Sequence, residues 1–279
     1  MSRRILSIIK ISRPLNLVIV YLSVLVAGFI CSKDNAMPFQ IFIAAASASF
    51  IAAAGYIIND YFDIKIDEIN RRDRPLVSGL LSKKSAVIYY IFFSLAGLLF
   101  AAVINYTAFI VAGLTVMLLL LYSYKIKAIT LLGNLSIAVL TGLTFIYGGI
   151  SVNNVSFAVI PALFALLINF IREVVKDMED IDGDTKNGIE TFPSKFGFSY
   201  AKNFIVLVTV LLILFTCYPY IFRLYNIEYF IIVMSIVNPI LVYVLVSIYK
   251  NDSVSNLNKL SFILKLDMIF GLSAIFLGK

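Results

Sequence analysis

The sequence of 279 residues contains no histidine and no tryptophan, and it has only two cysteines. Without histidine, the chain lacks the side chain that most often serves as a metal ligand and as a general base near neutral pH. Cys31 and Cys217 are too few and too far apart in sequence to indicate a disulfide framework or a thiolate metal site, and we expect them to be apolar packing residues. Any metal chemistry must therefore use oxygen ligands.

Charged residues are also scarce. They make up 14% of the chain, against about 25% in soluble domains, while hydrophobic residues make up 61% and the mean hydropathy is +0.97. Apolar stretches long enough to cross about 30 Å of hydrocarbon lie at residues 15–32, 39–58, 85–104, 107–124, 131–151, 155–175, 200–221, 229–249 and 260–277. They lack the alternating pattern of a barrel strand. The sequence predicts an all-α polytopic membrane protein, one domain of nine transmembrane helices over residues 1–279.

The basic residues predict the orientation of this bundle, because short loops rich in Lys and Arg stay in the cytoplasm. Most of them lie in the amino-terminal arm and in the loops after the second, fourth, sixth and eighth stretches, whereas the opposite side holds only Lys33, Arg223 and Lys279. We therefore expect a protein of the cell membrane with a cytoplasmic amino terminus. The net charge of +7 follows from this topology, so the expected partner is the bilayer and no nucleic acid.

Acidic residues are concentrated in two segments. The first acidic segment (residues 59–74) and the second (residues 173–190) hold twelve of the sixteen: Asp60, Asp63, Asp67, Glu68 and Asp73, then Glu173, Asp177, Glu179, Asp180, Asp182, Asp184 and Glu190. In the first, Asn59, Asp63 and Asp67 recur every four residues, and in the second, Asp177, Asp180 and Asp184 recur after three and four. Both spacings place oxygen atoms on one helical face if the helix continues beyond the hydrocarbon.

Carboxylates one helical turn apart repel one another, so such a face is costly unless cations neutralise it. Mg²⁺ prefers oxygen ligands and is commonly held by a few carboxylates together with substrate phosphates. Two facing acidic segments could therefore hold a diphosphate through bridging Mg²⁺ ions. The plainer alternative is a pair of solvated loops of mixed charge, which the regular spacing and the equivalent positions of the segments disfavour.

Basic side chains near the acidic segments suit a diphosphate better than a bare ion. Arg71, Arg72 and Arg74 offer planar sets of donors for phosphate oxygens, and Lys125 and Lys127 follow the fourth stretch. The positive-inside rule alone would also place basic residues in these loops. Their combination with the acidic segments favours a diphosphate site.

Several motifs resemble the UbiA superfamily of intramembrane prenyltransferases. NDYFDIKID at residues 59–67 is similar to the NDxxDxxxD motif of that family, and DIDGD at residues 180–184 is similar to its DxxxD motif. Further similar stretches are SRPLN at 12–16, NRRDRPLVSG at 70–79, YSYKIK at 122–127, GN at 133–134 and KNGIETFPSKFG at 186–197. The resemblance covers most of the chain, in order, and is more specific than either aspartate motif alone.

This resemblance implies a bundle around a central cavity, where both aspartate motifs bind a prenyl diphosphate through Mg²⁺. It implies catalytic roles for Asn59, Asp63, Asp67, Asp180 and Asp184, metal contacts for these five and for Asp60 and Asp177, and substrate contacts for Arg13, Asn16, Arg71, Arg72, Arg74, Tyr122, Lys125, Lys127 and Asn134. Many members have YxxxK where this chain has Ile126 four residues after Tyr122. Either Lys125 or Lys127 could take the place of that lysine.

Within the superfamily, KDMEDIDGD at residues 176–184 and LYSYKIKAITLLGN at 121–134 are most similar to the archaeal digeranylgeranylglyceryl phosphate synthases. This similarity implies transfer of a geranylgeranyl group from geranylgeranyl diphosphate to geranylgeranylglyceryl phosphate, with formation of an ether bond in membrane lipid synthesis. The phosphate of that acceptor calls for additional cations, which Arg13, Lys125, Lys127 or Lys265 could supply. The alternative is prenylation of an aromatic acid, a quinone precursor or a tetrapyrrole.

Two other classes of function remain open at this point. A cation transporter would place acidic residues in the middle of its spans, whereas here nearly all lie at predicted helix ends; a noncatalytic prenyl-lipid scaffold would not need Asp63. Lys265 and Asp267 lie near the predicted start of the ninth stretch and could pair with each other. The similar stretches that follow the two acidic segments suggest two four-helix halves plus a ninth helix.

Overall fold

The computed structural model describes residues 3–33 and 37–279, with side chains from Leu6 onward. Every regular element in these residues is a helix, which confirms the all-α prediction. The nine elements long and apolar enough to cross a membrane are α2 (Pro14–Cys31), α3 (Phe39–Phe62), α5 (Lys83–Ile104), α6 (Tyr106–Tyr124), α7 (Leu132–Ser151), α8 (Val159–Glu179) with the turn before it, α11 (Phe198–Ile221), α12 (Ile227–Ile232) continuing into α13 (Asn238–Lys250), and α14 (Val254–Leu277). Each overlaps one of the nine predicted stretches.

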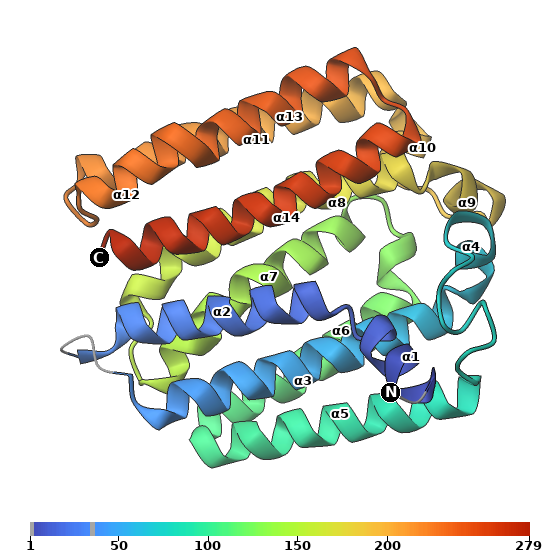
Figure 1. Ribbon diagram of the computed structural model, residues 1–279, viewed down its shortest axis with the longest axis horizontal. Coiled ribbons are helices and arrows are strands. Elements are labelled where there is room, and N and C mark those ends of the chain that lie inside the picture. Colours follow the sequence, from blue (N-terminus) through green and yellow to red (C-terminus); the bar gives the residue numbers. More distant parts are fainter. Residues whose placement is uncertain (1–2, 34–36) are drawn as a thin grey trace.

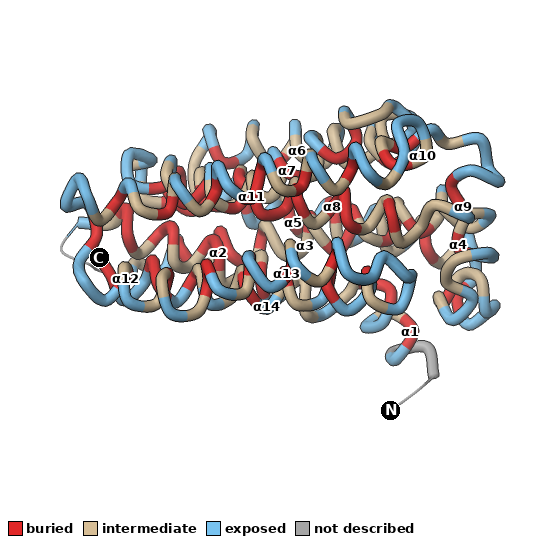
Figure 2. Tube along the Cα trace, turned by 90° about the horizontal axis from the view of Figure 1, so that it is seen from above, coloured by how far each residue is buried: buried red, intermediate tan, exposed pale blue. Residues whose placement is uncertain are grey.

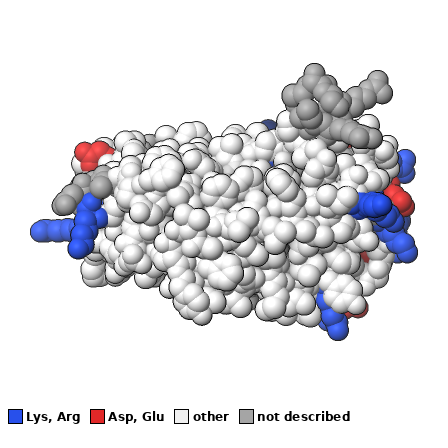
Figure 3. Space-filling view, turned by 90° about the horizontal axis from the view of Figure 1, so that it is seen from below, with Lys and Arg blue, Asp and Glu red and all other residues white. Residues whose placement is uncertain are grey.

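The spans run back and forth along one long axis, and the short helices gather at one end of it (Figure 1). This end holds α1 (Arg3–Ile11), α4 (Ile64–Asn70), α9 (Ile181–Lys186) and α10 (Phe192–Phe196), while the carboxyl terminus lies at the other. The charged side chains of the face seen in Figure 3 also gather almost entirely at the two ends. The long uncharged zone between them suits a hydrocarbon layer, where an exposed charge is costly.

Close approach between spans depends on small residues, because lipid tails are as apolar as the helices and association relies on tight packing and interhelical hydrogen bonds. Between α3 and α5, the hydroxyl of Ser47 donates to the carbonyl oxygen of Gly97 at 2.7 Å. A Cβ atom at Gly97 would lie 2.5 Å from the Ile51 side chain. Glycine is therefore required for this contact.

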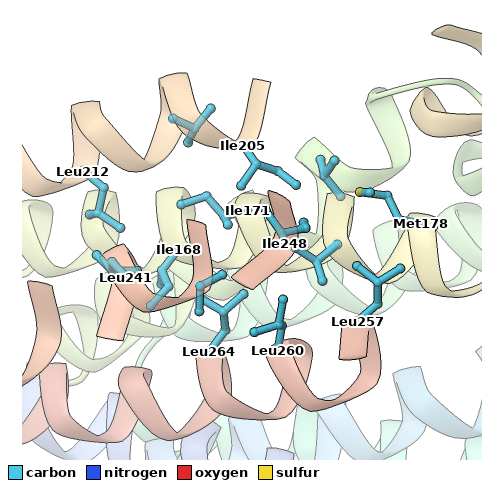
Figure 4. Packing of buried hydrophobic residues seen from close by; sticks show 14 of the residues in the cluster. Ile168, Ile171, Met178, Ile205, Leu212, Leu241, Ile248, Leu257, Leu260 and Leu264 are labelled. Carbon is cyan, nitrogen blue, oxygen red and sulfur yellow. The ribbon is translucent and has the colours of Figure 1, made fainter. Parts of the chain in front are cut away.

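Larger side chains fill the other half of the bundle. One apolar cluster joins α8, α11, α13 and α14, and includes Ile171, Ile205, Leu241 and Leu260, all almost completely buried (Figure 4). The buried positions of the spans face inward along most of their length (Figure 2). This packing holds α8 and α14 against each other, and both helices contribute to the cavity described below.

Both acidic segments interrupt their helices at an aspartate. Asp63 separates α3 from α4 with φ −88° and ψ 4°, and Asp180 separates α8 from α9 with φ −91° and ψ 6°. The helices thus continue beyond the spans as predicted, but with a break that brings α4 and α9 side by side across the end of the bundle (Figure 1). The matching geometry of the breaks supports two similar halves.

The ninth span begins earlier than predicted. α14 starts at Val254 because Ser253 caps it, its side chain accepting a hydrogen bond from the backbone of Asn256 at 3.4 Å. Asp267 consequently lies near the middle of this helix and not near its start. No ion pair joins Lys265 to Asp267, because residues two apart on a helix do not face each other, and the two side chains line different cavities.

Candidate active site

The two acidic segments are in direct contact. The amide nitrogen of Asn70 donates to the backbone oxygen of Asp180 at 3.0 Å, and Nη2 of Arg71 donates to both carboxylate oxygens of Asp180 at 3.0 and 2.9 Å. A Cβ atom on Gly183 would lie 2.3 Å from the Asn70 amide, so glycine allows α9 to approach α4. Residues more than a hundred positions apart are thereby held together, as the facing arrangement requires.

Arginines neutralise the buried carboxylates of the first acidic segment. Asp60 is 3% exposed and accepts hydrogen bonds from Arg13, at 2.6 Å, and from Arg74. Arg74 also forms an ion pair with Asp67 at 3.0 Å. Arg13 has a left-handed backbone conformation between α1 and α2, and its guanidinium lies 4.8 Å from the centre of the Tyr56 ring. Arg13 and Arg74, both predicted to bind substrate, are thus paired with aspartates in this structure.

Lys127 and not Lys125 reaches the acidic segments. Lys127 lies in the short turn Ile126–Ala128 after α6 and forms an ion pair with Asp63, whereas Lys125 is exposed. Asp63 also accepts a hydrogen bond from the amide of Asn59 at 2.7 Å. The resemblance left open whether Lys125 or Lys127 takes the place of the lysine in YxxxK. The structure favours Lys127, because it contacts Asp63 and Lys125 does not.

Of the other predicted substrate contacts, Asn134, Asn16 and Tyr122 lie at the site, whereas Arg72, like Lys125, lies outside it. Asn134 donates to Asp177 at 2.8 Å, and Asn16 and Tyr122 line the cavity beneath the acidic segments. Arg72 is exposed, and its Nε donates back to the carbonyl oxygen of Glu68 at 3.1 Å. Arg72 and Lys125 are therefore the predicted substrate contacts that this structure does not bring to the site.

Burial changes the protonation of the groups at the mouth of the site. It raises the pKa of Asp67 to about 6, with the neighbouring carboxylate of Asp60 adding to the rise and Arg74 opposing it. Burial likewise raises the pKa of Asp184 to about 6, assisted by repulsion from Asp180. The pKa of Lys127 falls to about 8, mainly because its ammonium is buried. Such shifts are typical of sites where a charged ligand completes the neutralisation.

A cavity of about 190 Å³ extends from these groups into the bundle. Its lining comes from α2, α3, α6, α7, α8 and α14 and is mostly apolar, with the rings of Tyr56, Tyr122 and Tyr147 among the walls. Asn59 and Arg13 lie at its polar end, close to the acidic segments. The arrangement suits a molecule with an anionic head and a long apolar tail.

The oxygen atoms at the site suit a hard divalent cation. Asp63 Oδ1 and Asp67 Oδ2 are buried and accept no hydrogen bond, although each has an ion-paired neighbour. In the described part of the chain, no three acidic or cysteine side chains converge closely enough to enclose a metal. The candidate ligands are instead distributed over two segments, which is compatible with Mg²⁺ because this ion commonly takes few protein ligands and completes its shell with water and phosphate.

Comparison with known proteins identifies the family. The model of the UbiA prenyltransferase family matches residues 20–266. The chain belongs to the UbiA prenyltransferase family. As a member, it is a membrane-embedded prenyltransferase with several spans, in agreement with the nine apolar helices.

Relatives of this UbiA family member include digeranylgeranylglyceryl phosphate synthases. Those of Methanosphaera stadtmanae and Thermococcus sibiricus are 31% and 35% identical to it, over 97% of this chain and 98% and 96% of theirs. A solved structure described as digeranylgeranylglyceryl phosphate synthase in membranes has a TM-score of 0.76 at 30% identity, covering 99% of both chains. A UbiA homolog from Archaeoglobus fulgidus bound to GPP and Mg²⁺ has the same fold, with a TM-score of 0.66 at 18% identity over 96% of this chain and 99% of that one.

Three polar residues of the cavity were not among the predicted site residues. Asn169, Arg172 and Lys176 line it from α8. They lie at positions i, i+3 and i+7 and hence on one helical face, a spacing that could have been noticed in the sequence. Arg172 and Lys176 lie next to Glu173 and Asp177 at the charged end of the predicted span, where the positive-inside rule already accounts for basic residues.

Proposed function

We propose that this chain transfers a geranylgeranyl group from geranylgeranyl diphosphate to geranylgeranylglyceryl phosphate, forming an ether bond in the synthesis of archaeal membrane lipids. The observation that carries the proposal is the contact between the two acidic segments above an apolar cavity. The relatives named digeranylgeranylglyceryl phosphate synthase, which match this chain over nearly its whole length, support the choice of acceptor. No observation favours an aromatic acceptor.

Mg²⁺ is the proposed cofactor, and the Archaeoglobus fulgidus homolog with GPP and Mg²⁺ supports this choice. Asn59, Asp63 and Asp67 would hold it from the first acidic segment, with Asp60 beside them, and Asp177, Asp180 and Asp184 from the second. When bound, the cation neutralises negative charge on the diphosphate. The buried oxygens of Asp63 and Asp67 that accept no hydrogen bond would ligate it once Lys127 and Arg74, their ion-pair partners, turn toward the diphosphate.

The residues of the chain prepare the donor for cleavage between C1 and the diphosphate oxygen. Arg71, Arg74 and Lys127 lie close enough to the acidic segments to transfer their hydrogen bonds from carboxylates to phosphate oxygens. The apolar cavity excludes water from the allylic cation that remains, and the faces of Tyr56 and Tyr122 can stabilise it. The electron pair of the broken C1–oxygen bond leaves with the diphosphate, the oxygen of the acceptor hydroxyl bonds to C1, and the hydroxyl proton passes to a nearby carboxylate or to water.

We further propose that the end of the bundle with the acidic segments faces the cytoplasm of the cell. Lys10, Lys65, Lys83 and Lys84 lie at this end, together with the arginines of the first acidic segment. An excess of basic residues in short loops is characteristic of the cytoplasmic side. The prenyl diphosphate would then bind from the cytoplasm, and the diphosphate product would be released to the cytoplasm.

A test uses the purified full-length chain in lipid nanodiscs with labelled geranylgeranyl diphosphate, Mg²⁺ and a panel of acceptors. The panel contains geranylgeranylglyceryl phosphate, an aromatic acid and a quinone precursor. We expect an ether product from the first acceptor alone, and a loss of rate of about 100-fold or more in Asp63→Ala and Asp180→Ala.

Asp182→Ala is the matched control, because Asp182 lies within the same short motif but is exposed. It should retain nearly full activity. Product from an aromatic acceptor in place of the glyceryl phosphate would refute the assigned substrate, and undiminished turnover in EDTA would refute the role of the metal.

A further inference from the structure

The cavity contains a group of hydrogen-bond donors that the contact between the acidic segments does not use. Asn169 is 4% exposed, and its amide nitrogen has no hydrogen-bond partner; Nε of Arg172 is likewise buried without a partner. Both residues line the cavity from α8. A buried donor without an acceptor costs free energy, about 1–3 kcal/mol in typical cases, so these two donors indicate a ligand with acceptor oxygens.

Two ammonium groups complete this group of donors. Lys176 lies one turn after Arg172 on α8, and Lys265 faces the same cavity from α14. Neither lysine forms an ion pair within the described residues, whereas Lys127 and Arg74 at the mouth do. We call Asn169, Arg172, Lys176 and Lys265 the donor group.

The charge of the cavity is positive. Arg13, Arg172, Lys176 and Lys265 line it, and the acidic residue that lines it within the described chain is Glu173. Glu173 accepts a hydrogen bond from Arg172 at 2.6 Å and lies within electrostatic range of all four cations. Arg13 is paired with Asp60, and Lys176 also lies within electrostatic range of Asp177 and Asp184. Glu173 then faces both Arg172 and Lys265, so an anionic ligand would complete the charge balance in a low-dielectric site.

We propose that the donor group binds the phosphate of the acceptor lipid, at a position distinct from the diphosphate site between the acidic segments. This inference rests on the proposed function and adds a substrate subsite to it. Lys176 precedes Asp180 by four residues, which is about 6 Å along a helix. A glyceryl phosphate bound there would have its hydroxyl within a few bonds of the phosphate, and therefore near C1 of a prenyl donor held at Asp63 and Asp180.

The position explains why Asn169 and Lys265 form no hydrogen bond or ion pair with the described residues of the acidic segments, whereas Lys176 lies nearer the mouth, within electrostatic range of Lys127 and Asp184. A diphosphate with its cations would occupy the carboxylates of both acidic segments, and a second phosphate beside it would be repelled unless it had cations of its own. Arg13, Lys125, Lys127 and Lys265 were the sequence-based candidates for this role. Of these, Arg13 and Lys127 are paired with aspartates and Lys125 is exposed, which leaves Lys265.

The test compares acceptors with and without the phosphate. The full-length chain in nanodiscs is given geranylgeranyl diphosphate, Mg²⁺ and either geranylgeranylglyceryl phosphate or geranylgeranylglycerol. In Lys265→Met and Asn169→Leu, we expect KM for the phosphorylated acceptor to rise about tenfold or more. KM for the donor should be unchanged, and the preference for geranylgeranylglyceryl phosphate over geranylgeranylglycerol, measured as the ratio of their kcat/KM values, should fall by a similar factor.

Lys259→Met is the matched control, since Lys259 lies on the same helix but is exposed, and it should leave both constants unchanged. Lys265→Arg should retain most of the preference for the phosphorylated acceptor, because it keeps the charge. A rise in KM for the donor, or an equal effect on both acceptors, would overturn the subsite.

Failure of the proposed function is distinguishable from failure of the subsite. If the wild-type chain makes no product from geranylgeranylglyceryl phosphate, the proposed function is wrong. If it makes the product and Lys265→Met changes only KM for geranylgeranyl diphosphate, these four residues bind the diphosphate and not the phosphate of the acceptor. Thermal stabilisation by geranylgeranylglyceryl phosphate, measured without donor or Mg²⁺, gives a binding result that does not require turnover; equal stabilisation of wild type and Lys265→Met would also refute the subsite.

Discussion

The guanidinium of Arg71 contacts the carboxylate of Asp180 across 109 sequence positions, with Nη2 2.9 Å from Oδ2. One cation thus connects the two acidic segments before any ligand is present, and it also contacts Glu179 at 3.3 Å. A bound divalent cation would compete with Arg71 for the same carboxylate. This competition makes the metal dependence of stability informative.

Arg71→Gln should lower the thermal stability of the metal-free protein by about 1 kcal/mol, because Asp180 and Glu179 lose their cationic neighbour. Mg²⁺ should stabilise the variant more than the wild type, since no ion pair has to be broken. Thermal unfolding with EDTA or with Mg²⁺ measures both effects. Arg72→Gln is the control because Arg72 is exposed; an equal response to Mg²⁺ in wild type and Arg71→Gln would contradict the competition.

Gly183→Ala should lower the rate more than tenfold while the spans remain folded. The added Cβ would lie 2.3 Å from the Asn70 amide and 2.5 Å from other atoms of that side chain, so α9 must move away from α4. A shift of this size at a site that positions reacting atoms costs rate steeply. Gly113→Ala should have little effect, since its Cβ meets nothing within 4 Å; steady-state kinetics of the two variants would decide, and equal rates would show that the approach is not needed.

The apparent affinity for Mg²⁺ should rise between pH 5 and pH 7. Asp67 and Asp184 have a pKa of about 6 in the folded chain, raised from 3.8 by burial, and a metal binds only their deprotonated form. Below pH 6 each proton that must leave weakens binding, by up to about tenfold per pH unit. Thermal shift titrations with Mg²⁺ at several pH values measure this, and a flat profile would contradict it.

The same pKa shifts make the stability of the metal-free protein fall, and not rise, as the pH increases. Because both carboxyl groups bind protons more tightly in the folded chain than in the unfolded one, their contribution to folding is complete below pH 4 and is lost as the pH rises through 6. In EDTA, the wild type should therefore lose stability over this range. Asp67→Asn should reduce that loss, and an unchanged pH profile in this variant would argue against the shift.

Asp267→Leu should raise thermal stability. Asp267 is completely buried in the middle of α14, and neither carboxylate oxygen has a hydrogen-bond partner. Removing such a group is worth about 1–3 kcal/mol. Asp267→Asn should gain less, because its amide would also be unpartnered. Unfolding curves of the two variants test this, and a less stable Asp267→Leu would show that the carboxyl group has a role that the packing does not reveal.

The sequence was sufficient for the spans and the acidic segments, because apolar length and carboxylate spacing are local patterns. The sequence did not indicate which basic residues reach the acidic segments. Lys125 and Lys127 differ by two positions in the same turn, and only the path of that turn against α7 places Lys127 at Asp63. The predicted roles of the aspartates in metal binding remain predictions.

Other features depended on contacts between distant helices. The donor group needs α14 opposite α8, and nothing in the two sequence segments indicates that these helices pack together. The start of α14 at Val254, six residues before the predicted start, depended on a cap at Ser253, and this difference moved Asp267 to mid-helix. Arg72 belongs to the same basic motif as Arg71 and Arg74, and nothing in the motif itself indicates which of the three points outward.

The paired breaks at Asp63 and Asp180 give the site a built-in asymmetry. Four residues before the first break the chain has Asn59, and four residues before the second it has Lys176. Two frames of matching backbone geometry thus present an amide on one wall and an ammonium on the other. Under the proposed subsite, the ammonium of Lys176 would favour the acceptor phosphate on the side of the second break, so that donor and acceptor occupy fixed places before either bond changes.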